Sequence, residues 1–286
     1  MTTLTALGTT ARVTRADLLR TRRWPAVWIV VGAWLLLNAL FGYVFDYITY
    51  TSGDSSFSNQ GESRAALLAG ILPQGMPDHL VQGMPMFGGA LMMVLGALLA
   101  GSGYGWGTWK TAFTQGPSRA ATTMGSLASL ALLIIGVVLV TVVSDLCLSL
   151  GVAGLQSQHV VWPALGEVAK LTGVAVLVMG MWAMIGYLLG VLARGPAVAV
   201  GLALVWSLVI ENLLRGVGAS LGAVDAFAKL LPGTAAGSLV GQLVGVGDAP
   251  GVLDTIGAHR ALATAVIYLA AAPLLAVLLV RRRDVS

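Results

Sequence analysis

Residues 168–214 read VAKLTGVAVLVMGMWAMIGYLLGVLARGPAVAVGLALVWSLVIENLL. Two long apolar runs flank the tripeptide Arg194-Gly195-Pro196. A helix rises about 1.5 Å per residue and the hydrocarbon core of a bilayer is roughly 30 Å thick, so about 20 mostly apolar residues cross it. A Gly-Pro pair breaks a helix, and proline is well suited to begin the next one. The stretch therefore predicts two membrane-spanning helices joined by a tight turn.

The rest of the chain has the same apolar character. Of its 286 residues, 57% are hydrophobic and 10% are charged, and its mean hydropathy is +0.87. Soluble domains carry roughly 25% charged residues, and disordered chains combine low hydrophobicity with high net charge, so both classes are excluded. The sequence predicts an all-α polytopic membrane protein with a single transmembrane domain over residues 1–286. Its six spans are expected at residues 24–45, 85–103, 122–145, 167–193, 196–214 and 261–280.

The basic residues indicate how these spans are oriented. With six spans both termini lie on one side, and Lys and Arg concentrate in cytoplasmic loops. The side of the termini holds 11 of the 16 basic residues and two of the 12 acidic ones, a net charge of +9, whereas the other side carries −5. Both termini are therefore expected in the cytoplasm. The basic residues form short clusters beside span ends rather than one continuous stripe, which argues against nucleic-acid binding.

The N-terminal residues 1–23 are too polar to span. Their leucines gather on one helical face while arginines populate the rest, a pattern typical of a helix that lies in the membrane interface with arginines reaching anionic headgroups. Trp24-Pro25 then turns the chain into the bilayer. A frayed basic tail is the alternative.

Residues 104–119 form the predicted cytoplasmic loop between the second and third spans. Trp106, Trp109 and Phe113 have the i, i+3, i+7 spacing that gives a helix one aromatic face. We expect no partner for these rings within the small cytoplasmic surface of the chain. Lys110 and Arg119 are expected to face water or phosphate. An interfacial aromatic belt is the alternative, and the glycines of the loop match no phosphate-binding pattern.

Two further segments lie outside the predicted spans. The external stretch 46–84 is expected to be a small cap of solvated loops, because Asp78 and His79, like Asp54 and Glu62, have no metal-ligand spacing.

Residues 217–247 contain two apolar stretches of 13 residues, 219–231 and 234–246, around Pro232-Gly233. Each is about 20 Å long as a helix, too short to cross. They predict a re-entrant hairpin packed against the bundle.

Ionisable residues inside spans are functional candidates by default. Asp145 and Lys170 are expected at similar depth near the outer leaflet, where pairing would stabilise both. Glu211 lies four residues before Arg215, a spacing that permits a local pair, and Asn212 follows it. Paired structural charges are one interpretation, and a gate or substrate pathway formed by Asp145, Lys170, Glu211 and Asn212 is the other. The single cysteine, Cys147, is expected to be a small buried residue.

Taken together, these features resemble the permease subunits of ABC-2-type ATP-binding-cassette transporters. The most specific match is Gly107-Thr108-Trp109-Lys110 followed by Pro117-Ser118-Arg119, which is similar to the "G-T … P-x-S-R" cytoplasmic segment of that family. Members often carry a glutamate shortly before the Gly-Thr pair, where this chain has Ser102, Gly103 and Tyr104.

The resemblance implies a mechanical role. In this family a separate cytoplasmic ATPase binds ATP and Mg, and the loop after the second span is a coupling helix seated on it. Carried over to this chain, residues 104–119 are the coupling helix, and this chain itself binds no cofactor. The implied partners are an ATPase dimer, a second permease copy or paralogue, and the bilayer of a bacterial plasma membrane. The implied coupling residues are Trp106, Gly107, Thr108, Trp109, Lys110, Phe113 and Arg119.

The expected function is therefore export of an amphipathic or hydrophobic substrate, such as a drug, antibiotic or lipid, by a subunit that is not itself an enzyme. A secondary transporter driven by an ion gradient is the main alternative, although its usual mark, corresponding broken helices in both halves, is not visible. An intramembrane enzyme is disfavoured because His79, His159 and His259 fall in outer loops without a matching motif.

Overall fold

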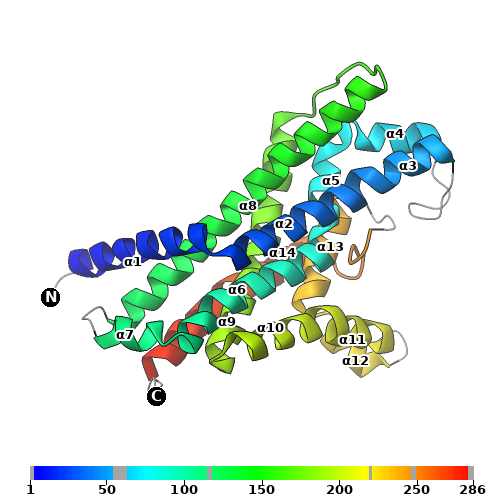
Figure 1. Ribbon diagram of the computed structural model, residues 1–286. Coiled ribbons are helices and arrows are strands. Elements are labelled where there is room, and N and C mark those ends of the chain that lie inside the picture. The colour runs from blue at the N-terminus through cyan, green and yellow to red at the C-terminus, as the bar shows by residue number, and fades with distance from the viewer. Residues whose placement is uncertain (1–2, 54–62, 115–117, 219–220, 246–248, 283–286) are drawn as a thin grey trace.

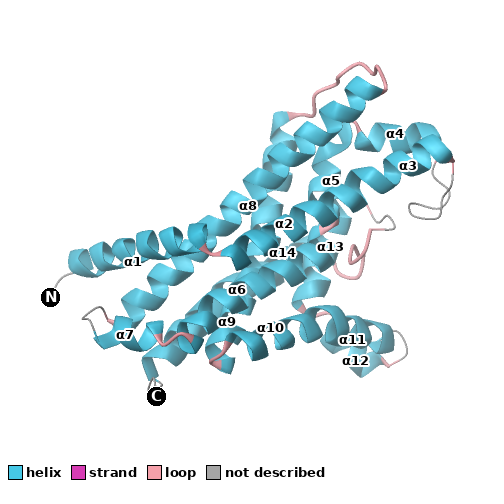
Figure 2. Ribbon diagram, viewed as in Figure 1, coloured by secondary structure: helices cyan, strands magenta, loops and turns pink. Residues whose placement is uncertain are grey.

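The computed structural model describes residues 3–53, 63–114, 118–218, 221–245 and 249–282. Over these ranges it contains helices and no strands (Figure 2). Six helical segments are long and apolar enough to cross a membrane, which confirms the predicted all-α polytopic architecture. They are Pro25–Ser52, Met84–Gly105, Arg119–Leu155, Leu165–Ala193, Pro196–Gly218 and Ala258–Arg282.

Three of the spans include a short π-helical segment. These segments are Leu40–Val44, Met84–Gly88 and Val205–Ile210. The α-helices, labelled in Figure 1, are α1 Thr3–Arg23, α2 Pro25–Ala39, α3 Phe45–Ser52, α4 Arg64–Ile71, α5 Met76–Gln82, α6 Gly89–Gly105, α7 Thr108–Thr114, α8 Arg119–Leu155, α9 Leu165–Ala193, α10 Pro196–Leu204, α11 Glu211–Gly218, α12 Gly222–Ala228, α13 Pro232–Val244 and α14 Ala258–Arg282.

The centre of the bundle is the α6–α9 pair, the most extensive helix contact in the molecule. Glycines bring the two backbones together: a Cβ on Gly96 would overlap the carbonyl oxygen of Ala183, and one on Gly186 would overlap the carbonyl oxygen of Met93. Lipid tails are as apolar as leucine, so helices in a membrane associate through close packing of small residues. The spacing of these glycines therefore positions the core.

Both chain ends lie at the same end of the bundle as α7 and the Arg194 turn between α9 and α10 (Figure 1). This arrangement follows from the even number of spans. Arg194 has the left-handed backbone conformation, with φ of 53°, which reverses the chain before Pro196 starts α10. The N-terminal segment is the helix α1, as predicted, and it packs on α8. There the Thr14 hydroxyl donates to the carbonyl oxygen of Gly125 at 3.1 Å.

The helix that contains the third predicted span is longer than that span at both ends. α8 has 37 residues and continues ten residues beyond Asp145, to Leu155, which makes it about 56 Å long. Residues 146–155 contain no charge, glycine pair or proline to end a helix. Cys147, expected to be buried, is exposed on this extension.

The external stretch is helical where it is described, and the expected cap of solvated loops is wrong there. Ser63 caps α4 by accepting a hydrogen bond from the Ala66 amide at 3.2 Å, and Pro77 stands in the first turn of α5. α5 carries His79, whose Nδ1 is buried, into the bundle. Asp54 and Glu62 lie outside the described residues.

The segment before the last span fits the predicted hairpin in one half only. α13 begins at Pro232, residues 232–241 are all buried, and the helix packs on α14. The first half was expected as a 13-residue helix packed in the bundle, but α12 has seven residues and is largely exposed against α11. The fifth span continues to Gly218, so residues 217–218 of the predicted hairpin belong to that span. Re-entry of α13 into the membrane stays a prediction.

Candidate functional site

The short helix α7 is fastened to the bundle by one aromatic side chain. Trp109 is only 6% exposed, and its indole Nε1 donates to the carbonyl oxygen of Ala100 on α6 at 3.1 Å. The indole lies over Gly103, where any Cβ would overlap the ring. α7 is thereby held against the end of the second span.

The other aromatic residues of this loop also have partners in the chain. Trp106 packs edge to face on Trp24, with ring centroids 5.1 Å apart. Phe113 stacks on Trp109 at 5.3 Å, and the Arg119 guanidinium lies 5.8 Å from the centre of the Phe113 ring. The expectation that these rings lack partners in the chain is therefore wrong. The prediction that the three rings form one face of a helix is also wrong, since Trp106 precedes α7.

Gly107 and Ser118 have local structural roles at the two ends of the loop. Gly107 has φ of +66°, a left-handed conformation suited to glycine, and it allows α7 to start directly after α6. The Thr108 hydroxyl donates to the Gly103 carbonyl oxygen at 3.2 Å. Ser118 caps α8 by accepting from the Ala121 amide at 3.2 Å. Gly116 and Pro117, which precede this cap, lie outside the described residues.

The exposed surface of α7 and of the residues just before it has one basic and one aromatic side chain. Lys110 is exposed, and Trp106 is 56% exposed despite its contact with Trp24. Of the seven predicted coupling residues, Trp109 and Phe113 attach the helix, whereas Trp106 and Lys110 face outward. Gly107 and Thr108 shape the start of α7, and Arg119 lies over the Phe113 ring.

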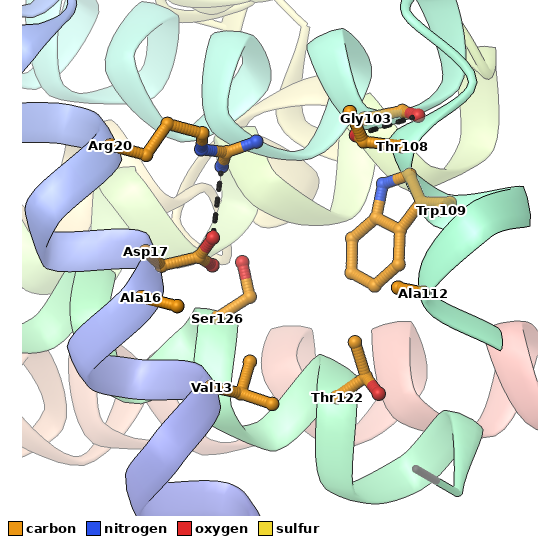
Figure 3. Close-up of a pocket in the computed structure, with 10 residues that line it drawn as sticks. All are labelled: Val13, Ala16, Asp17, Arg20, Gly103, Thr108, Trp109, Ala112, Thr122 and Ser126. Atoms are coloured by element: carbon orange, nitrogen blue, oxygen red, sulfur yellow. Dashed lines mark hydrogen bonds and ion pairs between the residues drawn. The ribbon is translucent and has the colours of Figure 1, made fainter. Parts of the chain in front are cut away.

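A cavity of about 290 Å³ opens beside α7, where α1, the end of α6 and the start of α8 meet (Figure 3). Figure 3 shows Asp17 and Arg20 pointing from α1 into the cavity and the Trp109 ring facing them from the other side, with Ser126 drawn on the Asp17 side. The rest of the lining is mostly small and apolar. It comprises Val13, Ala16, Gly103, Thr108, Ala112 and Thr122.

A second polar cluster lies deep in the bundle around Asp145, which is 0% exposed. Its Oδ1 accepts a hydrogen bond from the Asn38 amide on α2 at 2.6 Å, and its Oδ2 has no hydrogen-bond partner among the described residues. One turn away, Trp34 Nε1 donates to the Thr141 hydroxyl at 2.9 Å. These bonds tie the first span to the third.

The expected pairing of Asp145 with Lys170 is wrong. Because α8 continues to Leu155, Asp145 lies about 15 Å from that end of its helix, whereas Lys170 is on the second turn of α9 and exposed. No basic side chain of the described ranges forms an ion pair with Asp145. Asn38 was not among the predicted site residues, although an asparagine inside an apolar run is a recognisable signal.

His79 borders the same region from outside the spans. Its ring lies 5.3 Å from the ring of Tyr43, between ring centroids. Burial lowers the pKa of His79 to about 4, partly offset by a hydrogen bond with the Gly70 backbone. Nearby, burial raises the pKa of Asp78, and the charge of Glu167 raises it further. His79 is therefore neutral at physiological pH, and the solvated role expected for it is wrong.

A third cluster surrounds Glu211, which is 1% exposed. Trp206 Nε1 donates to Glu211 Oε1 at 3.0 Å. Arg215 donates to the side-chain oxygen of Asn212 at 2.8 Å rather than forming an ion pair with Glu211, although the two charges interact at longer range. The Glu211 and Arg215 side chains both lie against Gly233 at the start of α13. The cluster links the fifth span to α13.

The four predicted gate residues are therefore not brought together. Asp145 lies between the first and third spans, Glu211 and Asn212 lie beside α13, and Lys170 stands alone on the surface of α9. In the described part of the chain, no group of three or more His, Cys, Asp or Glu side chains has a metal-binding arrangement.

Comparisons with known proteins give no further guide to this site. A scan against protein-family models found no match, and a search of curated proteins found none either. The function is therefore inferred from the sequence pattern and the geometry of these three clusters.

Proposed function

We propose that this chain is the permease subunit of an ATP-binding-cassette exporter. The observation that supports the proposal best is the construction of α7. It is a short helix between two spans, attached to the bundle by Trp109, with Lys110 and Trp106 facing outward. A helix attached in this way moves with α6, as a coupling segment must. Aromatic side chains are also favoured anchors at protein interfaces.

The proposed orientation places α7 and both termini in the cytoplasm of a bacterial cell. The basic residues support it, since the end of the bundle that carries the termini and α7 also carries the net charge of +9. In this orientation the outward face of α7 meets a soluble ATPase that binds ATP and Mg. Arg119, in the first turn of α8, adds a basic side chain beside the same surface.

A second permease chain, either a copy or a paralogue, is part of the proposal. The fifth and sixth spans support it, because only 22% of an 18-residue apolar window is buried in each of them. The fifth span shows this most clearly. Its exposed residues are large and apolar, including Val198, Leu202 and Val209. A transport pathway between two such chains would be lined by apolar side chains, which favours an amphipathic or hydrophobic substrate.

The test is co-purification of an ATPase from membranes of the native host, with Lys110→Glu and Trp106→Ala as variants. We expect both variants to lose the ATPase while the bundle keeps its thermal stability. Lys170→Glu is the matched control, since this lysine is also exposed but lies near the start of α9, whereas the other end of α9 lies at the α7 end of the bundle. Retention of the ATPase by both α7 variants would refute the assignment of this surface.

An ion-gradient-driven transporter is a second candidate because of one observation. Asp145 is fully buried, accepts one hydrogen bond from Asn38, and forms no ion pair with the described basic residues. Buried intramembrane carboxylates commonly mark ion or proton pathways. Substrate uptake into liposomes that contain this chain alone, driven by a proton gradient without ATP, would favour this candidate over the exporter.

A further inference from the structure

The cavity beside α7 contains one acidic and one basic side chain that satisfy each other poorly. Asp17 Oδ1 and Arg20 Nη2 are 3.4 Å apart, longer than the roughly 2.7–2.9 Å of a strong charge-assisted hydrogen bond. Arg20 Nε is buried and has no hydrogen-bond partner in the described ranges. The guanidinium therefore keeps donor capacity at the cavity wall.

Further polar groups adjoin the same space. The buried Tyr187 hydroxyl interacts with the Ser126 side chain and, electrostatically, with both Asp17 and Arg20. Ser126, also buried, lies on the Asp17 side of the cavity (Figure 3). Opposite them the wall is apolar, because the Trp109 indole nitrogen is already bonded to Ala100 and its ring faces the opening.

We propose that this cavity binds the zwitterionic headgroup of an ethanolamine phospholipid, with the phosphate on Arg20 and the ammonium on Asp17. An anion alone would meet the Asp17 carboxylate, and a cation alone would meet the Arg20 guanidinium. A headgroup with both charges satisfies both side chains. A primary ammonium donates hydrogen bonds, which a quaternary choline group does not.

Size and position agree with a lipid headgroup. The cavity of about 290 Å³ is at the lower limit of pockets for drug-sized ligands, so it fits a headgroup better than a whole substrate. α1 has the composition of an interfacial helix, with exposed Leu19 beside its arginines. The acyl chains can then stay in the bilayer while the headgroup enters between α1 and α7.

A lipid at this position would contact Trp109, the residue that fastens α7. Lipid occupancy would thus support the proposed coupling helix from the side opposite its exposed face. The inference requires the membrane fold but not the ATPase, so lipid binding and ATPase co-purification can fail independently.

The test uses the full-length protein in nanodiscs with equal amounts of phosphatidylethanolamine, phosphatidylcholine and phosphatidylglycerol. After mild detergent extraction, native mass spectrometry counts the retained lipids. We expect selective retention of phosphatidylethanolamine and a roughly tenfold loss in Arg20→Gln, since charged hydrogen bonds contribute about that factor or more. Asp17→Asn should shift retention toward phosphatidylglycerol. Arg12→Gln, an exposed position on the same helix, is the control and should behave as wild type.

Arg20→Lys keeps the charge and should retain the lipid, which separates loss of binding from loss of fold. The inference is overturned if Arg20→Gln and Asp17→Asn keep the wild-type lipid pattern, or if the wild type retains the three lipids equally. Displacement of the lipid by an equal concentration of soluble glycerophosphoethanolamine would overturn the assignment to a membrane lipid.

Discussion

Gly186→Ala should destabilise the protein although it adds only one methyl group. A Cβ at this position would overlap the Met93 carbonyl oxygen and approach its Cα to 2.8 Å. These are backbone atoms, so relief requires α6 and α9 to separate along their main contact. Overpacking of a close-packed core typically costs about 1–3 kcal/mol.

The matched control is Gly173→Ala in the same helix, where an added Cβ meets nothing within 4 Å. Alanine is about 1 kcal/mol better than glycine in a helix interior, so this variant should be neutral or more stable. Gly186→Ala gains the same helix propensity, so the two variants should differ by the overpacking cost alone, about 1–3 kcal/mol, or roughly 2–12 °C in thermal midpoint on the scale of soluble proteins of this size.

The assay is thermal unfolding of both variants in one detergent, followed by tryptophan fluorescence and by the fraction that stays monodisperse. Gly96→Ala, which faces the Ala183 carbonyl oxygen, should repeat the loss from the other side of the contact. If Gly186→Ala is as stable as Gly173→Ala, the α6–α9 contact does not limit stability, and the account of the core given above is wrong.

Three further predictions concern the polar sites. Trp109→Phe removes the hydrogen bond to Ala100 and should lower stability by about 1–3 kcal/mol, whereas Trp106→Phe at an exposed ring should change thermal stability little. His79 has a folded-state pKa of about 4, below its usual 6.5. As the pH falls, the unfolded chain therefore binds a proton at His79 before the folded protein does, and the free energy of unfolding should fall by up to about 3 kcal/mol between pH 6.5 and 4. Thermal midpoints measured across this pH range should show the fall, and His79→Gln should reduce it. Asp145→Asn can still accept the hydrogen bond from Asn38, so this variant should keep its expression level and melting temperature while transport falls. Asp145→Leu leaves the Asn38 amide without this acceptor and should unfold more easily. Normal transport by a folded Asp145→Asn variant would exclude a gating role for this carboxylate.

The positions of the spans were predictable because their signal is local. Twenty apolar residues and a Gly-Pro break are read directly from the chain, and the six runs became six spans. The ends of the spans were less predictable. Residues 146–155 are as compatible with an external loop as with a helix, and only their packing on the first span and α4 decides in favour of α8.

The side-chain partners could not be predicted, because each one depends on the rotation of a helix about its axis. Asp145 faces Asn38 rather than Lys170, a choice made by the angle at which α8 lies against α2. Likewise Trp109 turns inward to Ala100, although its spacing from Trp106 favoured one shared outer face. An apolar run indicates that a helix is buried in the membrane but not which neighbour each face meets.

The contact between Trp109 and Gly103 has a mechanical consequence. With the indole hydrogen-bonded to Ala100 and seated on Gly103, α7 and the last turn of α6 form one stiff elbow. A force applied at Lys110 is then transmitted as a torque on the second span rather than absorbed by bending at Gly107. Small residues bring the α6 and α9 backbones into direct contact, so α9 moves when α6 moves. A displacement at one end of the bundle is then transmitted to the other end by helix packing and not by charged groups.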